Sequence, residues 1–143
     1  MIDIATFEES IITALGTIPE LKKVDVYQGE LAEENIAEIL AKMPLPAALT
    51  SYAGAKIDGE QARDRARGKA SVSFTIYVIG KNLRGKSDAA ADVRAILKKT
   101  RDALNGLIVN KLMLLWESEQ LRIITDTGVC AYAQTYGYTD YIA

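Results

Sequence analysis

The sequence predicts an α+β fold, a mixed and mainly antiparallel sheet with two or three helices packed on it. Three observations support this prediction. Residues 70–79 alternate apolar and polar side chains, which is typical of a strand with one buried face. Residues 88–104 repeat apolar side chains at helical spacing. Further strand-like runs follow in the last third of the chain, so the expected order is αβαββαβββ.

The first two expected elements are a helix and a short edge strand. Thr6 and Glu9 form a capping-box pattern near the start of the helix, and Gly16 marks its end. Residues 24–27 alternate in the manner of a strand. The helix is expected to bury the apolar residues that recur every three or four positions: Phe7, Ile11 and Leu15.

A second helix and a hairpin come next. Apolar spacing predicts a helix over residues 32–43, which the following Pro44-Leu45-Pro46 segment ends. Residues 47–52 and 70–79 predict two strands. The segment between them is polar and has no apolar periodicity, so we expect an antiparallel hairpin with a long connecting arm.

The last third of the chain completes the sheet. The helix over residues 88–104 is followed by expected strands over residues 112–117, 121–125 and 129–142, the last of which is rich in tyrosine. The helix is expected to turn four apolar residues toward the sheet: Val93, Ile96, Leu97 and Leu104.

The composition is that of an ordinary folded chain. Its 143 residues are 49% hydrophobic and 25% charged, and this length predicts one domain over residues 1–143. No apolar run is long enough to cross a bilayer, and the acidic N-terminal residues do not resemble a secretion signal, so we expect no membrane association. Cys130 is the only cysteine, so the chain has no internal disulfide. We expect this residue to pack in a strand as a small apolar side chain.

Charge is sorted along the chain. Residues 1–55 have a balance of −6, residues 56–101 of +7 and residues 102–143 of −3. Sequence blocks need not form faces, because folding can mix them. The core of the basic third, residues 56–69, nevertheless predicts a flexible basic arm suited to an acidic surface, to phosphates or to a copy of the same protein. Its cations are Arg63, Arg65, Arg67 and Lys69, together with Lys56.

Residues 80–87 match the P-loop pattern G-x-x-x-x-G-K-[ST], which predicts nucleotide binding through Lys86 and Ser87. Glu117 or Asp126 would then be the acid on the metal side. Two features argue against this interpretation. The residues inside the loop are larger than a phosphate cradle favours, and the preceding strand alternates as in an antiparallel sheet.

The absence of histidine bears on catalysis. Histidine is the most frequent general base and metal ligand in proteins. We therefore expect a protein that is not an enzyme and that binds no cofactor and no metal. Trp116 and the C-terminal tyrosines are suited to stacking on bases. The net charge of −2 and the position of these aromatic residues in acidic segments do not favour nucleic-acid binding.

Several short motifs resemble the tail terminator proteins of Mu-like phages and prophages. They include the V-D-V-Y segment followed by Gly29, the P-L-P-A segment before a strand that ends in Tyr52-Ala53-Gly54, and the tyrosine-rich last strand. The strongest is Y-V-I-G-K-N-L-R-G over residues 77–85. The resemblance spans most of the chain, although residues 56–69 and Lys86-Ser87 do not match it.

This resemblance implies a non-enzymatic α+β subunit that closes into a ring, usually of six, on the completed tail tube. Its implied partners are copies of itself, the tail tube and sheath proteins and the head–tail connector. It would be found in the host cytoplasm during assembly and then in the virion tail. Another neck or tail-completion module of the same particle remains an alternative. The expected subunit or tail contacts are Arg63, Arg65, Arg67, Lys69, Asn82 and Arg84.

Overall fold

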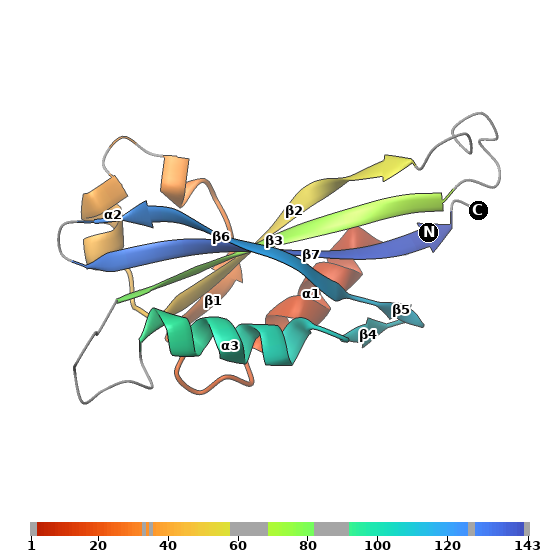
Figure 1. Cartoon of the computed structure of the whole chain (residues 1–143), viewed down its shortest axis with the longest axis horizontal. Coiled ribbons are helices and arrows are strands. Elements are labelled where there is room, and N and C mark those ends of the chain that lie inside the picture. The colour runs from red at the N-terminus through yellow and green to blue at the C-terminus, as the bar shows by residue number, and fades with distance from the viewer. Residues whose placement is uncertain are drawn as a thin grey trace.

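The computed structural model describes residues 3–32, 34, 36–57, 69–81, 92–125 and 128–141. It confirms the α+β class, with a five-stranded sheet in the order β1-β2-β3-β7-β6 and helices packed against it (Figure 1). In chain order the elements are α1 (Ile4–Leu15), β1 (Lys23–Val26), the 3-10 turn η1 (Glu30–Ala32), α2 (Ile36–Lys42), β2 (Ala47–Ile57), β3 (Lys69–Lys81), α3 (Val93–Leu104), β4 (Ile108–Val109), β5 (Leu112–Met113), β6 (Leu115–Ile124) and β7 (Val129–Tyr141).

The sheet is mixed as the sequence predicted. β1 pairs parallel with β2, and the remaining neighbours pair antiparallel, including the expected β2–β3 hairpin. β2 is longer than the predicted strand over residues 47–52, since it continues to Ile57. Lys56 and Lys69 therefore lie in strands and not in the connecting arm. The rest of that arm, residues 58–68, lies outside the described residues.

The first helix begins earlier than its sequence pattern indicated. The Asp3 side chain accepts a hydrogen bond from the backbone N–H of Ala5 at 3.2 Å and caps the helix at Ile4. The predicted capping box of Thr6 and Glu9 is wrong, because both residues already lie inside α1. The helix ends at Gly16 as expected. Its predicted inward residues are all buried: Phe7, Ile11 and Leu15.

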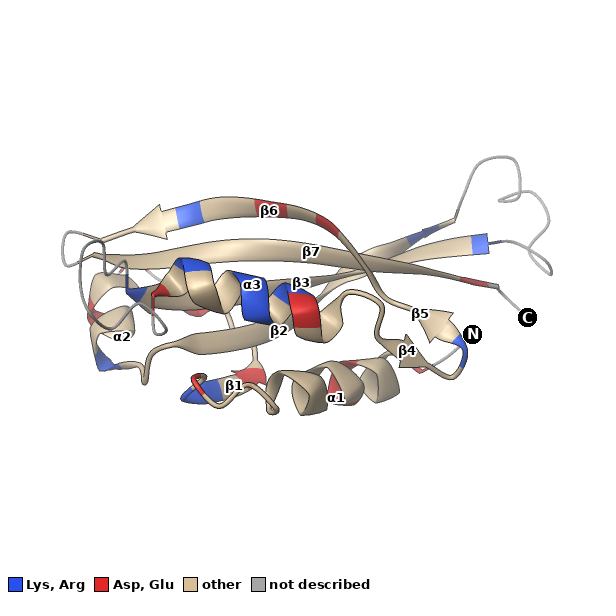
Figure 2. Ribbon diagram, turned by 60° about the horizontal axis from the view of Figure 1, so that its bottom comes forward, with Lys and Arg blue, Asp and Glu red and all other residues tan. Residues whose placement is uncertain are grey.

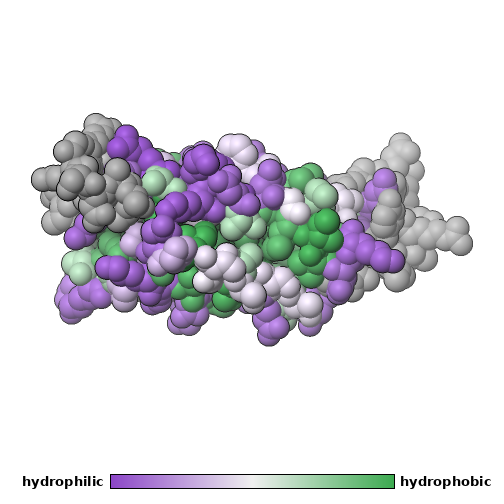
Figure 3. Space-filling model, turned by 90° about the horizontal axis from the view of Figure 1, so that it is seen from below, coloured by the Kyte–Doolittle hydropathy of each residue, from purple (hydrophilic) through white to green (hydrophobic). Residues whose placement is uncertain are grey.

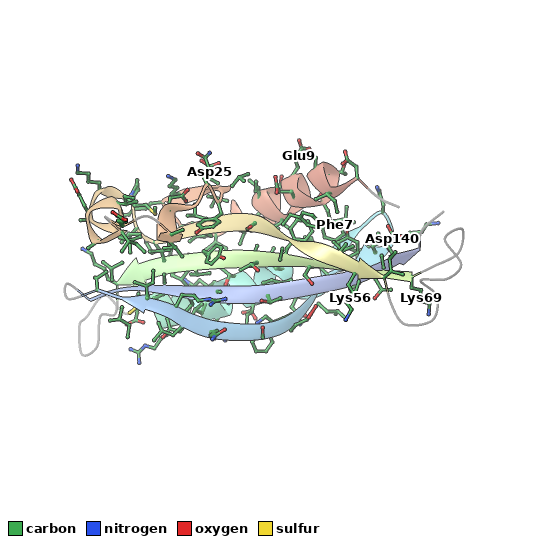
Figure 4. The ribbon with its side chains drawn as sticks, turned by 90° about the horizontal axis from the view of Figure 1, so that it is seen from above. Phe7, Glu9, Asp25, Lys56, Lys69 and Asp140 are labelled. Atoms are coloured by element: carbon green, nitrogen blue, oxygen red, sulfur yellow. The ribbon has the colours of Figure 1, made fainter. Side chains whose placement is uncertain are left out.

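The main core lies between the sheet and the helices α1 and α3, which are below the sheet in Figure 1. Phe7 points from α1 toward the sheet, whereas Glu9 points away from it (Figure 4). The Phe7 ring stacks on Tyr138 with centroids 4.2 Å apart and lies 5.8 Å from the Phe74 ring. The alternating face of β3 supplies the centre of this core, as its pattern predicted: Val72, Phe74, Ile76 and Val78.

The second helix covers the opposite face of the sheet at one end. Leu40 of α2 packs in a separate cluster with Leu49 of β2 and Ile79 of β3. The predicted helix over residues 32–43 is too long, because α2 occupies only Ile36–Lys42 and is preceded by η1. Much of this sheet face beyond α2 carries small polar side chains that alternate with the core: Ser71, Ser73, Thr75 and Thr135.

The strands after α3 differ from the prediction. The expected strand over residues 112–117 is divided, because residues 112–113 form β5 of the short β4–β5 hairpin. The rest of it and the expected strand over residues 121–125 form one continuous strand, β6. Residues 117–120 read E-S-E-Q, a polar run without the alternating apolar residues that predict a strand. It lies in the strand because β7 pairs with β6 along its whole length.

The third helix begins at its cap residue, Asp92. The Asp92 carboxylate accepts the backbone N–H of Arg94 at 2.8 Å and its guanidinium Nε at 3.0 Å. This pairing raises the pKa of Arg94 above its ordinary value. Residues 88–91, which the sequence assigned to this helix, lie outside the described part of the chain. In that described part, no helix is long and apolar enough to span a membrane.

Candidate assembly surface

The large apolar side chains that reach solvent gather on two strands. Among the described residues, eight such side chains are exposed, and six of them lie on β2 or β6. On β2 they are Tyr52 and Ile57, at 42% and 44% exposure. Those on β6 are 41% to 64% exposed: Leu115, Trp116, Leu121 and Ile124. Exposed apolar side chains that gather on the same strands make these strands candidates for a contact surface.

β6 is one edge of the sheet. It pairs with β7 on one side, and no other described strand pairs with its outer side. Two bulges insert Glu117 and Arg122 into the strand as extra residues. Bulges and charged side chains on an edge strand limit uncontrolled pairing with other chains. The edge therefore remains available to a partner of matching shape.

The start of β6 is held by the end of α3. The Asn105 side chain accepts the backbone N–H of Trp116 at 2.9 Å. The Arg101 guanidinium donates to Glu119 at 2.7 Å and lies 5.2 Å from the Trp116 ring centroid. On the outer side of β6, the backbone N–H of Trp116 is therefore already hydrogen-bonded, and the backbone available to a partner strand begins at Glu117.

The second half of β2 is the opposite edge. β1 pairs only with residues 47–50, and the last backbone bond on that side runs from the N–H of Tyr27 to the carbonyl of Thr50 at 2.9 Å. From Ser51 to Ile57, no described strand lies along this side of β2. A bulge at Ala53 separates Tyr52 from Gly54, whose φ of 125° is a conformation that glycine tolerates.

The β4–β5 hairpin carries the remaining two exposed apolar side chains. Ile108 is 60% exposed and Met113 is 47% exposed. The turn between the strands uses positive φ angles of 48° at Asn110 and 70° at Lys111. Beside the hairpin, a groove of about 610 Å³ separates it from the polar side of α1. The space-filling view shows hydrophobic side chains gathered on this part of the surface (Figure 3).

A buried polar network connects α3 to β6 and β7. Gln134 of β7 has no exposed surface, and its Oε1 accepts the hydroxyls of Thr100 and Tyr136 at 2.7 and 2.9 Å. Its Nε2 donates to the Leu97 carbonyl at 3.0 Å and to Glu119 at 2.8 Å. Burial raises the pKa of the Tyr136 hydroxyl far above its ordinary value. This network fixes the position of β6 relative to α3.

Folding mixes part of the charge that the sequence sorts into blocks. Each described cation of α3 pairs with a carboxylate, so this helix carries both signs (Figure 2). Two of these acids belong to α1–β1 and β6, segments far away in the sequence. The four pairs are Arg94–Asp92, Lys98–Asp102, Lys99–Glu20 and Arg101–Glu119.

Of the predicted contact residues, Lys69 belongs to the described part of the chain. Lys69 is at the start of β3, close to Lys56 and Asp140 on the neighbouring strands (Figure 4). All three lie at the end of the sheet away from α2. The other predicted contacts lie outside the described residues: Arg63, Arg65, Arg67, Asn82 and Arg84.

The context of the P-loop match differs from that of a nucleotide site. Only Gly80 and Lys81 of the pattern are described, and both lie in β3, which is antiparallel to both of its neighbours. The N-terminus of α3 is capped by the Asp92 carboxylate, a charge that repels phosphate. Lys86, Ser87 and Asp126 lie outside the described residues.

The proposed metal-side acid Glu117 is remote from this segment. It lies beside Gly137, which pairs with Ser73, seven residues along β3 from Gly80. That separation is about 23 Å along an extended strand. Within the described residues, no group of three histidine, cysteine, aspartate or glutamate side chains is placed to hold a metal ion.

The sequence predicted one edge strand correctly, because β1 lies at the end of the sheet, but it did not predict the edges formed by β6 and by the second half of β2. A pattern of alternation shows which face of a strand is buried, but it does not show which strand lies at the edge. One signal was present in β6, where apolar residues flank a charged run without strict alternation. An edge strand with bulges has this pattern, because each bulge shifts the alternation by one residue.

Comparison with known proteins gave a matching family model and similar solved structures. A family model described as "Bacteriophage Mu, Gp37" matches residues 3–136. No curated protein matched the chain. A chain of a solved structure described as "Virion of native gene transfer agent (GTA) particle" is similar with a TM-score of 0.56 and 14% identity, covering 96% of each chain. At that identity the similarity extends to the fold alone.

Proposed function

The chain belongs to the family described as Bacteriophage Mu, Gp37, and from this premise we propose that it is a tail terminator of a Mu-like phage particle. Copies of the chain close into a hexameric ring that caps the finished tail tube and supports joining to the head. The partners in this proposal are the tail tube, the sheath and the head–tail connector. The protein acts in the host cytoplasm during assembly and then remains in the virion tail.

One observation supports the proposed ring. Apolar side chains are exposed on two different edges of a single sheet. Tyr52 and Ile57 lie on the edge formed by β2, and Leu121 and Ile124 lie on the edge formed by β6. A subunit with complementary surfaces on two sides is suited to head-to-tail contacts, and such contacts close into rings when the rotation permits.

We propose that the ring acts through binding and catalyses no reaction. The histidine-free sequence and the antiparallel setting of β3 support this proposal. A titration of the purified protein with Mg·ATP and Mg·GTP tests it, with Lys86→Ala as the matched variant. Saturable binding that the substitution abolishes would favour a nucleotide-binding protein instead.

The position of the protein in the particle tests its proposed role. Gold labelling of a tagged chain in assembled particles should mark one end of the tail, at its junction with the head. Particles assembled without the protein should have tails of uncontrolled length that lack heads. Labelling along the whole tail or at its distal tip would contradict the proposal.

A label at the same junction combined with tails of normal length would indicate a different neck module of the particle. Pull-down with purified tube and sheath proteins separates these two roles. A terminator binds the end of the tube, whereas a neck module on the head side binds the connector.

A further inference from the structure

We propose that neighbouring copies in the ring pair edge to edge, with β6 of one copy aligned antiparallel to residues 51–57 of β2 in the next. This inference rests on the proposed ring and specifies the surface that closes it. The occupant of each edge is a second copy of the chain. The two edges lie on opposite sides of one sheet, so every copy offers both halves of the contact.

The strand directions determine the orientation of the pairing. β2, β3, β7 and β6 alternate in direction, so β2 and β6 are antiparallel within one copy. A rotation about an axis that runs along the strands leaves their directions unchanged. Around such an axis, β6 of one copy meets β2 of the next in an antiparallel arrangement, and the sheet continues from copy to copy.

The free lengths of the two edges match. The edge of β2 is free from Ser51, because β1 and Tyr27 occupy the preceding residues. The edge of β6 is free from Glu117, because Asn105 already accepts the N–H of Trp116. The stretch of each strand that can pair is six residues long, 51–56 on β2 and 117–122 on β6, because β1 occupies β2 up to Thr50. Six residues is a usual length for a strand pair.

One register brings the apolar side chains together. With Tyr52 opposite Leu121, the free segments pair from Ser51 to Lys56, and the side chains of Ile57 and Trp116 lie side by side just beyond the last pair. All four apolar side chains are on the sheet face that carries α1 and α3. β2 has one bulge, at Ala53, and β6 has one, at Glu117, within the paired stretch. Because each strand has one extra residue, the apolar side chains at both ends of this stretch lie on the same face of the sheet. Cross-strand apolar pairs of this kind stabilise a strand pair.

The same register pairs opposite charges on the other face. Lys56 shares a face with Ser71, and it lies opposite the bulge that contains Glu117. The Glu117 carboxylate covers Gly137 on that face, where a side chain at 137 would collide with it. Lys56 and Glu117 are both exposed. A shift of the register by two residues in one direction would place Tyr52 opposite Glu119, an apolar ring against a carboxylate. A shift in the other direction would place it opposite Ile123, whose side chain lies on the other face of the sheet.

Engineered disulfides test this register in the full chain. Tyr52→Cys combined with Leu121→Cys should give a ladder of covalent oligomers on mild oxidation, because directly opposed Cβ atoms are about 4.5–5.5 Å apart. Ser51→Cys combined with Leu121→Cys is the matched control, since Ser51 points to the opposite face. The native Cys130 is buried and is present in both variants.

Charge reversal provides a second, independent measurement. Lys56→Glu and Glu117→Lys should each raise the dissociation constant of a contact by about three- to tenfold, and the double variant should restore it. Glu9→Lys, on the solvent side of α1, controls for net charge. Trp116 is the only tryptophan, so its emission should shift to the blue on association.

The outcomes separate this contact from the ring itself. A ladder confined to the matched cysteine pair, with rescue by the double charge variant, supports the inference. Oligomers seen by light scattering that form equally well in all variants would overturn the edge pairing and leave the ring proposal intact. A chain that stays monomeric alone and on purified tail tubes would overturn both.

Discussion

The hydroxyl of Thr100 donates to Oε1 of Gln134 at 2.7 Å, and both residues are fully buried between α3 and β7. Gln134 also accepts from Tyr136 and donates to Leu97 and Glu119, so all its strong hydrogen-bonding positions are used. Because every hydrogen-bonding group of this buried amide has a partner, the network holds α3 in a single position on the sheet.

Replacing this amide should be costly. We expect Gln134→Leu to lower the free energy of unfolding by about 2–4 kcal/mol, because it removes the hydrogen bonds to Thr100, Leu97 and Glu119 and leaves the buried Tyr136 hydroxyl without its bond to Gln134. Urea denaturation measures this change. Gln120→Leu, on the exposed part of β6, should change stability by less than about 0.5 kcal/mol. Equal losses for both variants would contradict the role of the network.

Two buried tyrosines of β7 should respond in opposite ways to loss of the hydroxyl. Tyr136 donates to Gln134 at 2.9 Å, whereas the Tyr138 hydroxyl is buried without a hydrogen-bond partner among the described residues. Tyr136→Phe should destabilise the fold by about 1 kcal/mol, and Tyr138→Phe should be neutral or stabilising. Thermal unfolding of the two variants provides the comparison. A loss on Tyr138→Phe would indicate a partner for that hydroxyl.

Alkaline pH should destabilise the fold through Tyr138. Burial, followed by the negative charge of Asp140, raises its pKa to about 12 from about 10 in an unfolded chain. The neutral phenol is therefore favoured by folding. The stability it contributes is complete below about pH 10 and is lost as the pH rises to about 12. Unfolding measured across this range should have a shallower pH slope in Tyr138→Phe.

Acid should weaken the attachment of α3 to the loop after α1. The hydrogen bond from Lys99 holds the pKa of Glu20 below its ordinary value. The contribution of this pair is therefore present above about pH 4.3 and is lost as the pH falls through the lowered pKa. We expect Glu20→Gln to flatten the loss of stability below pH 5. Glu8→Gln, on α1, serves as the control, and an identical profile for both variants would argue against the pair.

The local elements were largely predictable from the sequence. The faces of α1 and α3, the alternation of β3 and the β2–β3 hairpin all follow from apolar periodicity, because residues on one buried face recur at the period of their backbone. The start of α1 was missed, since Asp3 and Thr6 both suit a helix N-terminus and only the packing of Ile4 and Phe7 distinguishes them.

The sequence by itself determined which side chains face the core, and hence the α+β class and the mixed sheet. Only the tertiary structure decided that E-S-E-Q over residues 117–120 continues a strand and that α2 packs on the face opposite α1. It also decided that β6, and β2 beyond the predicted edge strand β1, have free edges. The physical reason is that periodicity depends on neighbours a few residues apart. Edge position depends on backbone hydrogen bonds between strands distant in the chain, which leave no local pattern.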